Sequence, residues 1–211
     1  MGRRTRGLAL TGSETPPLIY DYYGFPAHTY RLTYPAPGAP ALAARAAALL
    51  GEAGFAASID PSRGLDHGAF VPLKLAFPEA DIPLVEMSLD RSRDPLLHLR
   101  AGQALAPLRD EGVLIIGSGM SFHNMRGYGD PRSTTPSEAF DAWLTETATL
   151  SGPERAERLA RWTQAPSARF AHPEEEHLLP LMVAAGASEQ PGQRIFHDLI
   201  LETAISAFRF L

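Results

Sequence analysis

The sequence predicts an α/β fold, a three-layer sandwich with a mostly parallel central sheet and helices on both sides. Short apolar runs alternate with helical segments through the first half of the chain, which is the pattern of βαβ units. The run from Val113 to Ile116 is apolar, too short for a helix and bounded by glycines. Such a run is typical of a buried strand in a parallel sheet. We expect it to be the central strand.

The composition is that of an ordinary soluble domain. With 211 residues, 45% hydrophobic and 20% charged, the chain can form one sizeable core, so a single domain over residues 1–211 is expected. The net charge is −5, and arginines gather only at positions 3, 4 and 6, which argues against nucleic acid binding. Because there is no cysteine, any metal must be held by His, Asp or Glu. No apolar run approaches the roughly 20 residues of a membrane span, and we expect a cytoplasmic protein.

Boundary residues define the elements of the first half. Pro40 and Gly51 bracket an alanine- and leucine-rich helix, and Asp66 is placed as the N-cap of a helix that reaches Phe77. Asp94 caps a further helix to about Arg109, with leucines 96, 99, 105 and 108 on one face. Strands are expected at residues 7–11, 55–59 and 82–89.

The second half contains fewer strand signals. Residues 127–136 are rich in turn formers, and residues 137–150 and 153–162 are amphipathic helices by pattern. A helix is predicted over residues 171–186, with Pro173 in its first turn, Pro180 causing a kink and Gly186 at its end. Residues 204–211 are expected to form an apolar edge strand.

An aromatic loop lies between Pro16 and Pro40. Four prolines after position 25 prevent a helix, and six aromatic rings fall within 15 positions. Long ordered loops often carry function, so these rings are candidates for the wall of a binding pocket. The alternative is that they fill the side of the core, and the pattern does not choose between the two.

The central strand is followed by a glycine-rich turn. Gly117 and Gly119 let the chain leave the sheet sharply and place His123 at its carboxyl edge, where open α/β sheets bind ligands. A dinucleotide-binding fingerprint would need a third glycine at position 122, which is Phe122. We therefore set that function aside.

Three of the seven histidines stand in a distinctive context. His67 follows a capping aspartate, His123 follows the central strand, and His177 lies in an acidic first turn. His177 together with Glu174 or Glu176 can supply imidazole and carboxylate ligands, with Glu174 at i−3 on the same helical face. The acidic residues can equally serve the helix dipole without a metal. The other histidines, at positions 28, 98, 172 and 197, lack such a context.

Six ordered stretches carry a family resemblance: residues 16–26, 34–38, 64–68, 80–85, 117–124 and 176–181. Together they resemble the class III extradiol ring-cleavage dioxygenases, most closely the DOPA 4,5-dioxygenase branch, and the likeness runs from about Gly7 to Leu211. It implies a nonheme Fe(II) or Zn(II) ion, a small aromatic diol of the catechol type and O2 as reactants. By the same resemblance, His123 and His177 are metal ligands, and His67 and His123 transfer protons. A homo-oligomer is left open.

The resemblance also has a gap. Chains of this family open with one strand ending in His-Gly and another ending in Ser-Ala-His-Trp, and both histidines bind the metal; neither motif occurs here. We therefore expect the N-terminal strands to be missing, on the order of 30 residues, with weakened metal binding and an uncovered apolar face. A downstream start, a shortened chain and a degenerate paralogue all remain open.

Two alternatives to the dioxygenase function follow. One is a non-catalytic or metal-deficient fragment or paralogue of the fold, which acts by association through the uncovered face. The other is a metal-dependent hydrolase, which would need a bound nucleophilic water and more carboxylates than the motif regions offer.

Overall fold

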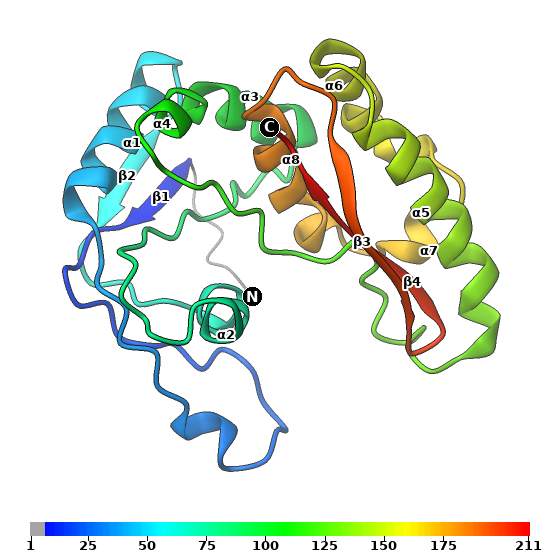
Figure 1. Cartoon of the computed structure of the whole chain (residues 1–211), viewed down its shortest axis with the longest axis horizontal. Helices are drawn as coiled ribbons and strands as arrows, with labels where there is room; N and C mark the ends of the chain where they lie inside the picture. Colours follow the sequence, from blue (N-terminus) through cyan, green and yellow to red (C-terminus); the bar gives the residue numbers. More distant parts are fainter. Residues whose placement is uncertain (1–6) are drawn as a thin grey trace. The chain divides into compact units, whose positions relative to one another are not determined.

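The computed structural model describes residues 7–211, and the chain divides into two compact units, one ending at Ser92 and the other running from Arg93 to Leu211 (Figure 1). The described residues form helices and two small sheets, one parallel and one antiparallel, which confirms the α/β class. The three-layer arrangement stays a prediction, and the three arginines near the N-terminus lie outside the described residues. Among residues 7–211, no helix is both long and apolar enough to cross a membrane.

The first unit contains a βαβ motif. Strand β1 (Leu8–Thr11) pairs in parallel with β2 (Ala57–Asp60), and helix α1 (Pro40–Glu52) lies between them in sequence. All four residues of β1 are buried, and α1 packs on both strands through a face that includes Leu49 and Leu50. The predicted strand at residues 7–11 and the predicted helix with its proline and glycine boundaries are confirmed.

The rest of the first unit contains the short helix η1 (Thr29–Arg31) and α2 (His67–Ala76). The Asp66 side chain accepts a hydrogen bond from the Gly68 backbone N–H at 3.0 Å, so the predicted N-cap is confirmed. The predicted strand at residues 82–89 is wrong, since this segment forms only isolated bridges to Leu10 and Gly38. Pro83 interrupts it because proline has no N–H to donate to a ladder.

The second unit is mainly helical. Its elements are α3 (Pro95–Leu105), α4 (Pro107–Asp110), η2 (Pro131–Ser133), α5 (Thr134–Ala148), α6 (Gly152–Ala160), η3 (Trp162–Gln164), α7 (Ala168–Ala171), η4 (Glu175–His177) and α8 (Leu179–Gly186). Helices α3 and α8 pack closely. Gly186 permits this approach, since a Cβ there would lie 2.1 Å from the Leu99 carbonyl oxygen. The predicted helix 94–109 is divided at Pro107, which lacks the N–H needed to continue it. Leu96, predicted on the buried face, is 49% exposed.

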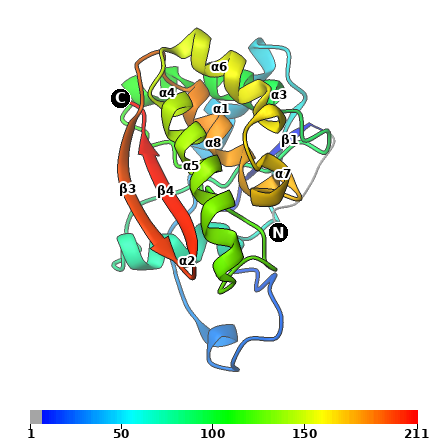
Figure 2. The ribbon, with the colours of Figure 1, turned by 90° about the vertical axis from the view of Figure 1, so that its right-hand side faces the viewer.

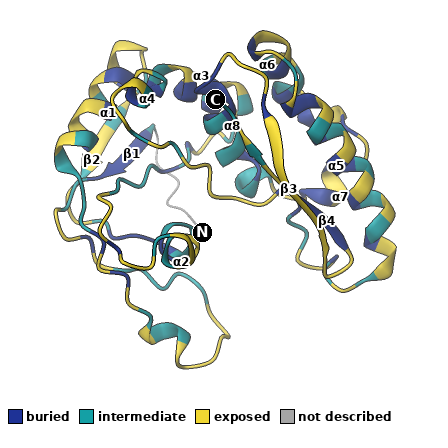
Figure 3. Ribbon diagram, in the orientation of Figure 1, coloured by how far each residue is buried: buried dark blue, intermediate teal, exposed yellow. Residues whose placement is uncertain are grey.

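The chain ends in a β-hairpin of β3 (Gln193–Ile200) and β4 (Thr203–Arg209). Its turn places Leu201 and Glu202 at positive φ, 49° and 65°. Strand β4 packs on α5 (Figure 2), whereas β3 is exposed along its whole length (Figure 3). The predicted C-terminal strand is therefore confirmed in β4, but its partner β3 was not predicted.

The predicted central strand is wrong as an element of secondary structure. Residues 113–118 run without helix or strand, and Leu114 and Ile116 are 72% and 54% exposed. No described strand lies in register with this segment, and a strand is stable only when a neighbour accepts and donates its backbone hydrogen bonds. The β-branched composition alone is not sufficient.

Candidate active site

In the second unit, the glycine-rich turn and the residues after it, 117–124, lie against the segment 171–177. The Met120 backbone N–H donates to the His177 carbonyl oxygen at 3.0 Å, and the His123 backbone N–H donates to the Ala171 carbonyl oxygen at 2.9 Å. Gly119 permits this approach, since a Cβ there would lie 2.2 Å from the His177 carbonyl oxygen. The glycine allows the two histidine-bearing segments to pack backbone against backbone.

The imidazoles of His123 and His177 are stacked. Their ring centroids are 3.4 Å apart and their planes differ by 15°. The structure thus brings together two of the three predicted site histidines, from segments far apart in the sequence. This juxtaposition is the central geometric feature of the candidate site.

The helix predicted over residues 171–186 is confirmed only from Leu179 to its end at Gly186, and its first half is wrong. Helix α7 ends at Ala171, Glu174 is extended, and α8 begins only at Leu179. Pro180 therefore lies in the first turn of α8, where a missing N–H costs nothing, and causes no kink. His177 sits in the short helix η4 between the two.

The acidic residues around His177 mostly bind arginines. Glu174 forms an ion pair with Arg93, whose pKa is raised chiefly by that hydrogen bond, and Glu175 pairs with Arg169 at 3.0 Å. The predicted pairing of Glu174 with His177 on one helical face is therefore wrong, because no helix spans the two. A Glu176 oxygen lies 3.9 Å from His177 Nδ1.

His172 supports the site and was not predicted. Its fully buried ring donates from Nε2 to the Ser121 carbonyl oxygen at 3.0 Å, while Nδ1 has no hydrogen-bond partner within residues 7–211. The ring packs edge-on against Phe140 and Trp162. Burial lowers the pKa of His172 to about 4, so the imidazole is neutral at pH 7. Its burial, which it shares with His98, is not visible in the sequence.

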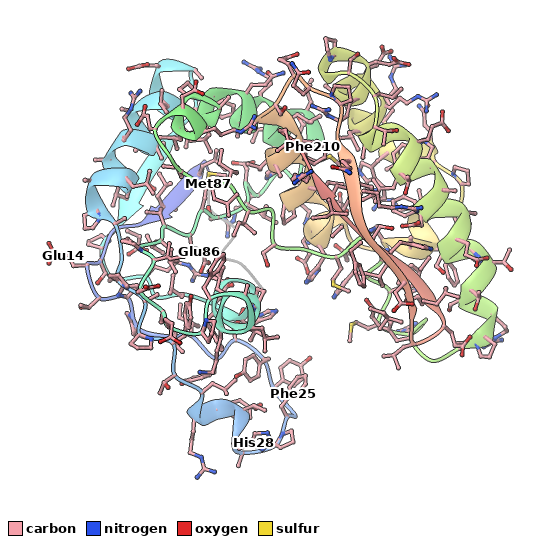
Figure 4. All side chains as sticks on the ribbon, in the orientation of Figure 1. Glu14, Phe25, His28, Glu86, Met87 and Phe210 are labelled. Atoms are coloured by element: carbon pink, nitrogen blue, oxygen red, sulfur yellow. The ribbon has the colours of Figure 1, made fainter. Side chains whose placement is uncertain are left out.

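His67 lies in the first unit, as the first residue of α2. Its Nδ1 is 2.7 Å from Asp21 Oδ1, and its backbone N–H donates to the same oxygen at 3.2 Å. Nearby, burial and the Asp66 charge raise the pKa of Glu86 to about 7, which places a readily protonated carboxyl (labelled in Figure 4) beside the N-cap.

The aromatic loop is partly core and partly surface. Tyr20 and Tyr22 pack on Phe70 with ring centroids 5.8 and 6.4 Å away. In contrast, Tyr23 and Phe25 are 91% and 59% exposed; Figure 4 labels Phe25 on this loop. Tyr20 and Tyr22 therefore contribute to the core while remaining half-buried, and the pocket-wall interpretation stays a prediction.

Comparison with known proteins identifies the family. Residues 5–208 match the family model described as the catalytic LigB subunit of aromatic ring-opening dioxygenase. The chain belongs to the LigB family. The resemblance stated from its six motifs is confirmed.

Relatives of this LigB-family chain have dioxygenase names. It is 46% identical to a 4,5-DOPA dioxygenase extradiol of Beta vulgaris over 191 residues, and 38% identical to that of Escherichia coli over 187 residues; the matches cover 85% and 87% of the chain and 68% of each relative. Dioxygenase tasH of Hapsidospora irregularis is 42% identical over 88% of the chain, which spans only 61% of that relative's length.

A solved structure shares the fold of the LigB-family chain. The crystal structure of an uncharacterized protein from Escherichia coli K12 superposes with a TM-score of 0.82 at 29% identity. The match covers 98% of this chain and 81% of the other.

LigB-family extradiol dioxygenases are generally metal-dependent, so the donor set can be tested against a metal. His123 and His177 offer imidazole nitrogens, a ligand type that suits both Fe(II) and Zn(II). Such a site needs about three protein ligands. Among the described residues, the group with three donors at ligand spacing is Asp21, Asp66 and His67, in the first unit. The stacked histidines therefore offer two nitrogens of a suitable type, fewer than the three ligands such a site needs.

Proposed function

We propose that this LigB-family chain is a single catalytic domain over residues 1–211, built on a three-layer α/β sandwich, that cleaves a catechol-type ring with O2. The observation that carries the proposal is the stacked pair of His123 and His177 beside the glycine-rich turn. The dioxygenase names of its relatives support the reaction class. A small aromatic diol and O2 are the proposed reactants.

His123 and His177 are proposed to hold the metal. A bound Fe(II) or Zn(II) ion supplies Lewis acidity toward the diol oxygens, and iron also supplies redox chemistry toward O2. The Gly119 contact keeps the two histidine-bearing segments in register. His172 is neutral at pH 7, so it adds no positive charge beside the pair.

The proposed proton transfers use His67 and His123. Imidazole titrates close to neutral pH, so a histidine can accept a proton from a diol hydroxyl and return it later. The rings of Tyr20, Tyr22 and Phe25 are proposed to wall the aromatic substrate. Unchanged catechol affinity after replacement of all three by alanine would contradict this last role.

The test combines metal content with oxygen uptake. The chain is incubated anaerobically with Fe(II), desalted and assayed for iron by elemental analysis, then for O2 consumption with DOPA. His123→Ala and His177→Ala should lower both readings, while His197→Gln, on the exposed strand β3, should leave both unchanged. If the unmodified chain neither retains iron nor consumes O2, the proposal is wrong for this chain.

A second candidate function is association without catalysis. Exposed Leu114 and Ile116 lie in a segment that forms no ladder with a described strand, and unpaired extended segments readily pair with another chain. The same segment lines a cavity of about 550 Å³ in the second unit, together with Leu181 and Phe208. Concentration-dependent dimers by light scattering that are lost in Ile116→Asp, combined with absent metal, would favour this function over the first.

A further inference from the structure

The Asp21–His67 pair connects the aromatic loop to helix α2. A single carboxylate oxygen of Asp21 receives both the ring Nδ1, at 2.7 Å, and the backbone N–H of His67, at 3.2 Å. The Asp21 side chain is 16% exposed and that of His67 is 37% exposed. The carboxylate is therefore largely withdrawn from water, while part of the imidazole remains accessible.

We propose that Asp21 is a positioning residue for proton transfer by His67, and this rests on the proposed function. A carboxylate only accepts hydrogen bonds, so a 2.7 Å contact requires the proton on Nδ1. The hydrogen bond at one ring nitrogen decides which nitrogen carries the proton. In the neutral ring, the lone pair that a base uses is then on Nε2.

The proton balance is simple. A diol O–H bond breaks, an N–H bond forms at Nε2, and the substrate becomes a monoanion while His67 becomes an imidazolium. His67 is the first residue of α2, where the helix dipole disfavours a positive charge. The Asp21 carboxylate offsets that charge, as acidic partners of catalytic histidines do.

The neighbouring contacts argue against a metal at this place. Asp66 belongs to the same three-donor group, but its carboxylate accepts from the Gly68 N–H at 3.0 Å and from Arg63 Nη2 at 3.1 Å. A cation there would compete with the Arg63 guanidinium. The Tyr22 ring stands edge-on to His67 with centroids 6.1 Å apart, which restricts rotation of the imidazole.

The first test reads the tautomer directly. The chain is labelled with ¹⁵N-histidine, the His67 signals are assigned by their loss in His67→Gln, and the spectrum is recorded without metal at pH 8. We expect a protonated Nδ1 and an unprotonated Nε2, with the proton moving largely to Nε2 in Asp21→Ala. A proton on Nε2 in the unmodified chain, or no change in Asp21→Ala, overturns the proposal.

The second test separates positioning from folding. With DOPA and O2, Asp21→Ala should lower kcat on the order of 10² to 10⁴-fold, the usual worth of general base catalysis, with a much smaller change in KM. Asp21→Asn, which keeps an acceptor but loses the charge, should fall between. Asp81→Ala, an exposed carboxylate of the same unit, is the matched control.

A rise in KM at unchanged kcat would mean that Asp21 only shapes the loop, and would refute the positioning role. If the unmodified chain shows no oxygen uptake, the proposed function fails. The tautomer spectrum then still decides whether Asp21 orients His67.

Discussion

Replacement of Arg155 by methionine should strongly destabilise the second unit. This arginine of α6 is 1% exposed, and its guanidinium lies over the Phe210 ring at 4.9 Å. No described carboxylate forms an ion pair with it; instead it donates to the backbone carbonyl oxygens of Leu150 (3.0 Å), Gln190 (2.6 Å), Ala185 (2.9 Å) and Ser188. It therefore joins the start of α6 to the end of α8 and the segment before β3.

The magnitude follows from those four carbonyl groups. Methionine fills most of the alkyl volume but donates no hydrogen bond, and each carbonyl left buried without a partner costs about 1–3 kcal/mol. Burial lowers the pKa of Arg155, so removing the buried charge returns part of this cost. We expect a net loss of about 4 kcal/mol, and about half of that for Arg155→Lys, whose ammonium has three donors.

The assay is urea denaturation at pH 7, followed by tryptophan fluorescence, because Trp143 and Trp162 both lie in the second unit. The control is Arg158→Met on the same helix, where a 39% exposed side chain pairs with Glu146 and should be worth less than about 1 kcal/mol. A loss below about 1 kcal/mol for Arg155→Met would refute the view that this guanidinium organises the unit.

Three further predictions concern titration and close packing. The pKa of Glu86 is raised from 4.5 to about 7, chiefly by burial, so the folded state binds this proton more tightly than the unfolded state. The contribution of Glu86 to the free energy of unfolding is fully present below pH 4.5, and up to about 3 kcal/mol of it is lost as the pH rises through 7. Glu86→Gln should abolish that decline in urea titrations at pH 5 and 8. Conversely, burial lowers the pKa of His172 from 6.5 to about 4, so its contribution is present above pH 6.5 and is lost on acidification toward pH 4; a His172→Phe variant that keeps the full acid sensitivity would contradict this. Gly119→Ala places a Cβ 2.2 Å from the His177 carbonyl oxygen and should reduce both Tm and iron retention, whereas Gly51→Ala, with no atom within 4 Å, should raise Tm slightly.

Local signals in the sequence determined several elements correctly. Pro40 and Gly51 mark the ends of α1 to within about a residue, and Asp66 caps α2. These features depend on side chains and backbone groups a few residues apart, so sequence spacing is sufficient to predict them. The family motifs single out His67, His123 and His177 as candidate site residues, and their roles stay a prediction.

Other features were decided by contacts between distant segments. The apolar run at residues 113–116 has the composition of a strand, but a strand needs a neighbour for its hydrogen bonds, and no described strand pairs with it. The exposed strand β3 shows the converse, since polar residues such as Arg194 and Asp198 pair with β4 because the hairpin turn brings them there.

At the candidate site, the sequence by itself determined which residue types are available, and the tertiary structure decided which of them come into contact. Spacing along the chain left Glu174 and Glu176 as candidate partners of His177, whereas in the fold Glu174 pairs with Arg93 because no helix joins positions 174 and 177. The burial of His172 and the 2.7 Å contact of Asp21 with His67, on which its proposed role rests, arise only in the folded chain. Burial and long-range hydrogen bonds are properties of the packed chain, because they depend on which surfaces exclude water together.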